Sequence, residues 1–274
     1  MTRPTPTARS DIPGFSNTGA PEDEGQHLQN AYRTARQHGG PGRFGFDPAA
    51  HLTESSPLAT RGAAERLFRE WRPHWDLDKP WLLEKSPPNL VRTRFLQALF
   101  PGARFVVLMR HPAAVALATV KMAAGTPVPR LIEHWLACHE RFEADRPHLE
   151  YALVVRYESF IAEPDALLLQ VYDFLGVAPC RLQQDIDPHG NRRYLERWNA
   201  FLRDGCRPDC PFPACRRLGR ARAARTPGTG KTKAASNPWD RGGRELRGAD
   251  TPLLERACRA AAPRTRRPRG PPPQ

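Results

Sequence analysis

The chain has 274 residues, a net charge of +13 and a mean hydropathy of −0.62. This length allows one α/β domain with a proper core, although 30 prolines and 20 glycines indicate that part of the chain is not packed. No apolar run approaches the roughly 20 residues of a membrane span, and the N-terminus lacks the apolar stretch of a secretory signal. We therefore expect a soluble protein, cytoplasmic by default.

The positive charge is concentrated at the C-terminal end of the chain. Residues 203–274 hold 18 Lys and Arg against 6 Asp and Glu, whereas residues 1–202 hold 24 against 23. The end is rich in Arg, Pro, Ala and Gly and cannot bury enough apolar surface to offset its chain entropy. We predict a disordered lead over 1–21, an α/β domain over 22–202 and a disordered basic tail over 203–274.

Apolar residues at spacings of three and four, together with helix-end signals, predict most of the helices. The predicted helix over 22–37 has acidic residues in its opening turn and is followed by a turn-rich connector over 39–48. The predicted helix over 57–71 is expected to pack on the sheet. In the predicted helix over 127–146, one face is expected to lie in the core. It carries Leu131, Trp135, Cys138 and Phe142. The predicted helices span 22–37, 57–71, 91–99, 127–146 and 164–175, with a further helix that starts at about Pro112 and a last segment over 191–202.

Short apolar runs predict three strands, over 81–84, 105–109 and 152–155. The second is valine-rich and continuous, as expected for a strand buried on both faces. Strands that alternate with helices indicate a parallel sheet, whose ligands bind outside the carboxyl ends of the strands. Lys85 and Arg110 each follow a strand, and two cations at that edge suggest a doubly anionic ligand such as a phosphorylated nucleotide.

Three sequence blocks in this order are similar to a known enzyme family. EKSPPN, FPGARFVVLMRHP and VVRYESFIAEPDALLLQVYDFLGV resemble sulfotransferases that use 3′-phosphoadenosine 5′-phosphosulfate (PAPS), and the resemblance covers roughly 14–202. It implies a P-loop-NTPase-like three-layer α/β sandwich with a parallel sheet. It also implies transfer of a sulfuryl group from PAPS to a hydroxyl or amine acceptor, such as a carbohydrate.

The resemblance assigns roles to four of the residues. Lys85 matches the lysine that contacts the transferring group, although a lysine after a strand is otherwise usually just solvated. Arg110 matches the arginine that binds the 3′-phosphate, with a strand-end salt bridge as the alternative. The second phosphate donor of the family, a serine eight residues later, is replaced by Ala118, and the adjacent Thr119 is the candidate substitute. Tyr157 matches a residue near the nucleotide, or else serves only in packing.

The general base is expected on the early segment EDEGQ, where Glu24 is our candidate. Some families of this fold use a glutamate from this region to take the acceptor's proton. His111 is a second candidate base, but it is better explained as a residue that orders the loop. Tyr194 and Trp198 resemble an aromatic pair that covers the nucleotide, with core packing as an equal interpretation.

One family feature has no counterpart in this sequence. PAPS sulfotransferases open with a strand and a glycine-rich loop that cradles the 5′-phosphosulfate through backbone N–H groups. Nothing before Gly14 fits this pattern, so we expect the first strand of the sheet and its loop to be missing. The alternative to an active sulfotransferase is therefore a truncated, inactive homologue. If an N-terminal anchor is missing too, the location would be the Golgi lumen, as for many relatives.

Two further classes of partner were considered. The basic tail would attract nucleic acid nonspecifically, but it contains no recognisable reading module. Cys206, Cys210 and Cys215 form a loose cluster without a histidine, so no metal site is predicted. The sequence does not indicate the oligomeric state.

Overall fold

The computed structural model describes residues 18–180 and 186–204. The chain divides into two units, residues 1–194 and 195–274. Both strands and helices α1 to α6 belong to the first unit. Most of the predicted lead and all of the predicted tail beyond 204 lie outside the described residues.

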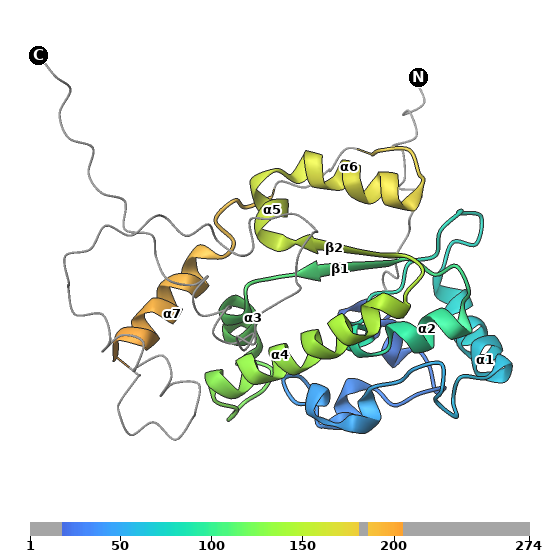
Figure 1. Cartoon of the computed structure of the whole chain (residues 1–274), viewed down its shortest axis with the longest axis horizontal. Coiled ribbons are helices and arrows are strands. Elements are labelled where there is room, and N and C mark those ends of the chain that lie inside the picture. Colours follow the sequence, from blue (N-terminus) through green and yellow to red (C-terminus); the bar gives the residue numbers. More distant parts are fainter. Residues whose placement is uncertain (1–17, 181–185, 205–274) are drawn as a thin grey trace, which may run out of the picture. The chain divides into compact units, whose positions relative to one another are not determined.

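The sheet has two parallel strands within the described ranges (Figure 1). β1 (Phe105–Met109) pairs along its whole length with β2 (Ala152–Arg156), so that Phe105 lies opposite Ala152 and Met109 opposite Arg156. Because the register is continuous, the residues that follow the strands, Arg110 and Tyr157, leave the sheet side by side. The sequence located both strands within one residue.

Four helices, α1, α2, α4 and α6, match the predictions over 57–71, 91–99, 127–146 and 164–175, and α5 is an additional helix. α3 (Pro112–Thr119) packs against α4 (Val128–Asp145), and α6 (Pro164–Leu175) lies along β2 (Figure 1). Pro164 begins α6, and Gly176 ends it in the left-handed conformation, both as predicted. The bounds are α1 Arg61–Trp71, α2 Thr93–Leu99, α3 Pro112–Thr119, α4 Val128–Asp145, α5 Tyr157–Ala162, α6 Pro164–Leu175 and α7 Arg192–Asp204.

The core lies largely beneath α1, α2 and α4. Leu67 and Trp71 of α1 pack against Phe95 and Leu99 of α2, and Tyr32 meets Phe95 edge to face. The predicted core face of α4 is buried, with Phe142 completely inaccessible. The residues predicted to form it are therefore core residues and line no site.

The prediction that 81–84 forms a strand is wrong. Residues 81–86 have no regular secondary structure, and side chains contact the Leu83 carbonyl and the Trp81 ring. The indole nitrogen of Trp75 donates to the carbonyl of Leu83 at 3.0 Å, and the guanidinium of Arg104 lies 5.0 Å from the Trp81 ring centre. A strand needs a neighbouring strand for its backbone groups.

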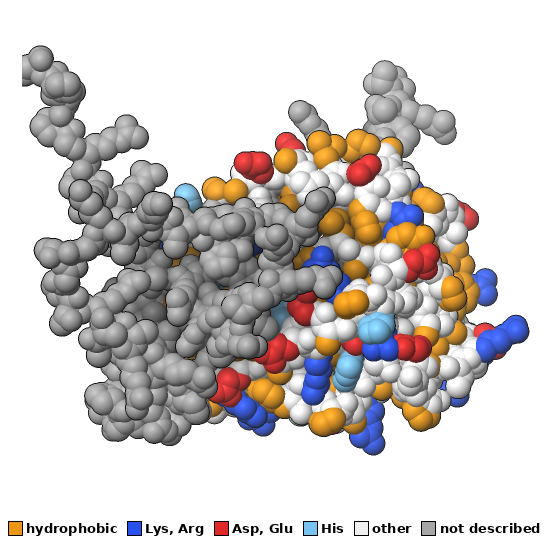
Figure 2. Space-filling model, in the orientation of Figure 1, with side chains coloured by type: hydrophobic (Ala, Val, Ile, Leu, Met, Phe, Trp, Pro, Cys, Tyr) orange, Lys and Arg blue, Asp and Glu red, His pale blue; other side chains and the backbone are white. Residues whose placement is uncertain are grey.

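The prediction that β1 is buried on both faces is also wrong. Val107 is buried, whereas Val106 and Leu108 on the opposite face are 41% and 53% exposed. None of the residues of α6 is buried, and Figure 2 shows apolar side chains gathered over that helix. In the described part of the chain the exposure of the sheet is confined to β1, since Val155 of β2, paired with Leu108, is buried.

The predicted helix over 22–37 is replaced by short 3₁₀ turns, Pro21–Asp23, Gly25–His27 and Ala35–His38. The buried side chain of Gln29 explains the difference. Its amide oxygen accepts from the backbone N–H groups of Ala31 and Tyr32, and its amide nitrogen donates to the carbonyls of Gln26 and Tyr32. One side chain thus satisfies the backbone groups that a helix would have paired.

A left-handed turn precedes Glu24. Glu22 and Asp23 have φ angles of 54° and 49°, a conformation that L-residues other than Gly, Asn and Asp rarely adopt. The turn is closed by a hydrogen bond of 3.1 Å from the Glu24 N–H to the Pro21 carbonyl. The Asp23 carboxylate accepts from the hydroxyl and the N–H of Thr18, at 2.7 and 2.9 Å.

Within the described residues no helix is both long enough and apolar enough to cross a membrane.

A first prediction concerns the strained turn. Glu22→Gly should raise the free energy of unfolding by about 0.5–1 kcal/mol, because glycine adopts a positive φ without steric cost. The exposed Glu140, in the middle of α4, provides the control, since Glu140→Gly should lower stability by about 1 kcal/mol. Urea unfolding measures both variants, and a loss of stability in both would contradict the strain.

A second prediction concerns two buried histidines of α4. Burial lowers the pKa of His134 and His139 to about 4 from 6.5. The unfolded chain takes up these protons at higher pH than the folded chain, so stability should fall as the pH falls from 6.5 towards 4. The Nδ1 atom of His139 is buried without a partner, and its ring lies 3.9 Å from that of Trp135.

His139→Phe keeps the ring and removes the titration. At about pH 4.5 the variant should lose about 2 kcal/mol less stability, relative to pH 6.5, than the unsubstituted protein. His148→Phe, at an exposed position, is the control. An identical pH dependence of unfolding in the unsubstituted protein and His139→Phe would refute the assignment.

Candidate active site

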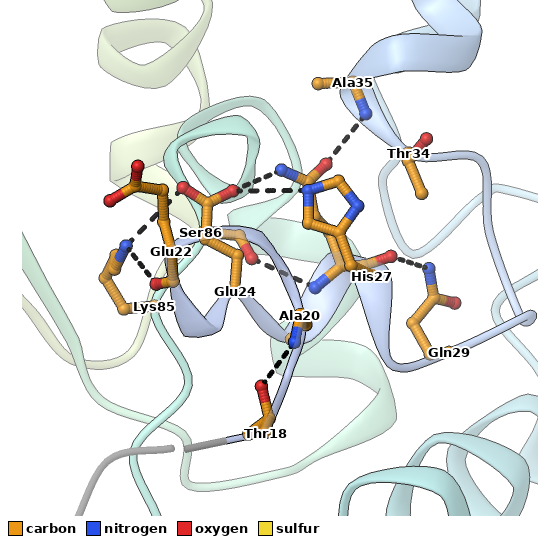
Figure 3. Close-up of polar contacts among 12 residues, drawn as sticks. Thr18, Ala20, Glu22, Glu24, His27, Gln29, Thr34, Ala35, Lys85 and Ser86 are labelled. Atoms are coloured by element: carbon orange, nitrogen blue, oxygen red, sulfur yellow. Dashed lines mark hydrogen bonds and ion pairs between the residues drawn. The ribbon is translucent and has the colours of Figure 1, made fainter. Parts of the chain in front are cut away.

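Glu24 and Lys85, 61 residues apart in sequence, meet in space (Figure 3). The Nζ atom of Lys85 lies 3.5 Å from Oε1 of Glu24 and donates to the Glu22 carbonyl at 3.2 Å. The Lys85 side chain is 59% exposed, whereas that of Glu24 is only 12% exposed. An ammonium group open to solvent is thus paired with a largely buried carboxylate.

The second oxygen of Glu24 faces the protein interior. Oε2 accepts a short hydrogen bond from the side-chain amide of Gln26 and lies 3.9 Å from Nε2 of His27. Gln26 is buried, and its backbone N–H donates to the Ser86 hydroxyl at 3.1 Å. Gln26, two residues after Glu24, is therefore bonded to Ser86, the residue after Lys85.

A partly buried carboxylate, that of Glu84, holds the loop around Lys85. Glu84 accepts from the hydroxyl of Ser86, the amide of Asn89 and the backbone N–H of Gly25. Burial raises the pKa of this carboxyl group, and the three donors oppose the shift. Glu84 thus joins the residue before Lys85 to the residue after Glu24.

Arg110 forms a second cluster at the carboxyl ends of the strands. Its guanidinium carbon lies 4.3 Å from the ring centre of Tyr157 and 5.1 Å from that of Tyr194. Nε donates to the Asn191 side chain at 2.8 Å, and one terminal nitrogen donates to the Gly190 carbonyl at 3.2 Å. The rings and these acceptors fix the plane of the guanidinium.

Glu158 also stabilises the Arg110 cluster, through two hydrogen bonds. One of its oxygens accepts from the backbone N–H of His111 at 3.0 Å and from the amide of Asn191 at 2.6 Å. Gly190 must lack a side chain, because a Cβ atom there would lie 2.6 Å from the Tyr157 hydroxyl. The Arg110 cluster is therefore built from the ends of both strands and from residues 190–194.

His111 orders the loop, as its alternative interpretation held. Its Nδ1 accepts from the N–H of Ala113 at 3.2 Å and so caps α3. Because a backbone N–H can only donate, Nδ1 carries no proton and the remaining hydrogen lies on Nε2. Burial lowers the pKa of this histidine, which favours the same neutral form.

The hydroxyl of Thr119 donates to the Val115 carbonyl one turn earlier, at 2.8 Å. Its methyl group lies next to the backbone of Gly42. Ala118 supplies no hydroxyl. To donate to a phosphate, the Thr119 hydroxyl would have to give up its hydrogen bond to the Val115 carbonyl.

The predicted residues thus fall into two groups that share no member. Glu24 lies with Lys85, and Tyr157 lies with Arg110 and Tyr194, whereas Trp198 belongs to the second unit. Sequence reasoning missed Gln26, Glu84, Glu158 and Asn191. Gln26 stands within the quoted EDEGQ stretch and Glu84 begins EKSPPN, but no spacing signals contacts between segments 60 residues apart.

No group of three or more His, Cys, Asp or Glu residues that could hold a metal ion occurs among the described residues. The cysteine cluster at 206–215 lies outside them.

Comparisons with known proteins agree with the sequence blocks. A solved sulfotransferase domain from the curacin biosynthetic pathway matches 60% of this chain and 67% of its own, at 19% identity and a TM-score of 0.38. A search of curated proteins found no significant match. The model of the sulfotransferase family matches residues 2–179, well over half of the chain. The chain therefore belongs to the sulfotransferase family, a family of PAPS-dependent enzymes.

Proposed function

We propose that this chain binds PAPS and transfers its sulfuryl group to a hydroxyl or amine acceptor, such as a carbohydrate. The observation that carries the proposal is the meeting of Lys85 and Glu24, which were selected independently as the cation and the base. The proposal includes the finer fold expectation, a P-loop-NTPase-like sheet. PAPS acts here as a substrate, and no metal is invoked.

In the proposed reaction, Glu24 accepts the proton of the acceptor hydroxyl while the acceptor oxygen forms a bond to sulfur. The bond from sulfur to the bridging oxygen of the donor breaks, and its electron pair stays on the 5′-phosphate of adenosine 3′,5′-bisphosphate. Lys85 stabilises the charge that develops on the bridging oxygen. The exposed ammonium and the buried carboxylate suit these two roles, because one must reach the donor and the other must be desolvated.

Arg110 is the proposed ligand of the 3′-phosphate. Its Nε and one terminal nitrogen are engaged by protein oxygens, which leaves N–H groups on the terminal nitrogens for phosphate oxygens. Tyr157 would support the guanidinium from one face. Thr119 is the proposed second phosphate donor, subject to the exchange of its bond to Val115.

The alternative is a catalytically inactive homologue. Two observations favour it, the alanine at 118 and the engaged hydroxyl of Thr119. Nucleic-acid binding would reside in the tail, outside the described residues. Binding of the donor product and turnover separate these alternatives.

A third prediction concerns nucleotide binding. Arg110→Ala should weaken the binding of adenosine 3′,5′-bisphosphate about 100-fold in calorimetry, because charge-assisted hydrogen bonds to the phosphate are lost. Arg110→Lys should recover only part of this affinity, since an ammonium cannot form the planar fork.

Arg104 provides a matched control. It is also surrounded by aromatic rings, those of Trp81, Tyr151 and Phe174, but it precedes β1 at the opposite end of the strand. Arg104→Lys should leave nucleotide affinity within about twofold. Equal affinities of Arg110→Ala and the unsubstituted protein would contradict the assignment, and a folded protein without any binding would favour the inactive homologue.

A fourth prediction concerns turnover. Lys85→Ala and Glu24→Gln should each lower kcat about 100-fold or more while nucleotide binding is kept. The assay measures transfer of radiolabelled sulfate from PAPS to a panel of 4-nitrophenol, a sterol, an amine and desulfated polysaccharides. Lys79→Ala, six residues earlier, controls for the loss of a positive charge. Full turnover in either site variant would remove that residue from the mechanism.

A further inference from the structure

The contacts of Gln26 go beyond those of a residue that only fills space. The residue is only 3% exposed, and its side-chain amide lies between the Glu24 carboxylate and the Ala35 N–H. The amide oxygen accepts from the Ala35 N–H at 2.8 Å, and the amide nitrogen donates to Oε2 of Glu24. Both ends of this amide therefore have a hydrogen-bond partner.

The orientation of the amide is set by chemistry. A backbone N–H can only donate, so the group of Gln26 that faces Ala35 must be its oxygen. The NH₂ group is then forced to face Glu24, and a flipped amide would place two donors together at Ala35 and two acceptors together at Glu24. The contact from residue 35 therefore fixes the donor that Glu24 receives.

Glu24 needs such a partner because its other contacts are weak. The Lys85 side chain is mostly exposed, and at 3.5 Å its solvated ammonium contributes little to holding Glu24 in one rotamer. His27 is farther away, at 3.9 Å. A buried hydrogen bond to a charged acceptor is stronger, since breaking it leaves desolvated polar groups unpaired.

We propose that Gln26 is the positioning residue of the candidate base: its amide, oriented by the Ala35 N–H, holds Glu24 so that Oε1 faces Lys85 and the acceptor. The inference rests on the proposed function for its catalytic consequence. The backbone of Gln26 is itself anchored to Ser86, so the same residue joins the base to the loop that carries Lys85.

The structure offers a matched control in Gln29. This residue is equally buried and lies in the same segment, but its side chain bonds only to backbone groups of Gln26, Ala31 and Tyr32. Gln26→Leu and Gln29→Leu therefore both remove a buried amide from this segment, and only the first removes a contact with Glu24.

The test is a double-mutant cycle in turnover with PAPS and the best acceptor of the panel above. Gln26→Leu should lower kcat about 10-fold or more, with the KM for PAPS within about twofold, because Glu24 is misplaced while the donor site is intact. In the Glu24→Gln background, where no base remains to be oriented, Gln26→Leu should cost less than about twofold. Gln29→Leu should change kcat by the same factor with and without the Glu24→Gln substitution.

Ala35→Pro is a second variant that leaves both Glu24 and Gln26 unchanged. It removes the N–H that orients the amide, and its site suits proline, since residue 35 begins a 3₁₀ turn and Thr34 has an extended conformation with φ −72° and ψ 165°. The expected loss of kcat is about threefold to 10-fold and is not additive with Gln26→Leu. If Gln26→Leu does not fold, Ala35→Pro tests the proposal in its place.

Equal losses from Gln26→Leu with and without the base would overturn the proposal, as would equal behaviour of the Gln29 control. If the unsubstituted protein transfers no sulfate to any acceptor, the proposed function has failed, and positioning is then judged by thermal unfolding. Strictly additive shifts of the midpoint in Gln26→Leu, Glu24→Leu and the double variant would show that the two side chains are not coupled.

Discussion

The candidate site depends on the junction between two short segments, residues 24–26 and 84–86. Glu84 accepts the N–H of Gly25, and Ser86 accepts that of Gln26, so two buried hydrogen bonds flank the Glu24–Lys85 pair. The ion pair contributes less to holding the segments together, because water competes for the exposed Lys85 ammonium. The buried bonds contribute more, because separating them without water would leave polar groups unpaired. The Trp71 indole adds a bond of 2.9 Å to the Gly25 carbonyl and ties this junction to α1.

The Arg110 cluster owes its geometry to the parallel register. Since Met109 is paired with Arg156, the chain leaves both strands at the same level, and Tyr157 comes to lie beneath the guanidinium of Arg110. Glu158 then binds the turn after β1 through the His111 N–H and the segment 190–194 through Asn191. An arginine held in this way has lost its rotamer entropy before any ligand arrives, which is the condition for binding an anion with little reorganisation. Arginine positioning and base positioning thus both use a polar side chain that accepts from a backbone N–H, Glu158 from His111 and Gln26 from Ala35.

The small sheet and the strained turn show where local structure is subordinate to the site. Left-handed residues at 22 and 23 are costly, yet they direct the Glu22 carbonyl and the Glu24 side chain towards one ammonium group. Residues 81–86 form no strand, and Lys85 projects from this irregular loop with its side chain 59% exposed. The sheet has two strands in the described residues, and Val106 and Leu108 of β1 are exposed.

The sequence by itself determined the family, the elements whose signals are local, and the residue types of the site. Strands 105–109 and 152–156, the helix that Pro164 begins and Gly176 ends, and the core face of α4 are all encoded by short-range periodicity and end signals. Tertiary structure alone decided that Glu24 meets Lys85, because nothing in the spacing of two residues 61 positions apart specifies a contact. It also decided against the helix over 22–37, since Gln29 binds backbone groups that a helical pattern assigns to the chain itself. A pattern records what each residue prefers locally, whereas the buried hydrogen bonds between segments arise only when the fold removes water from both partners.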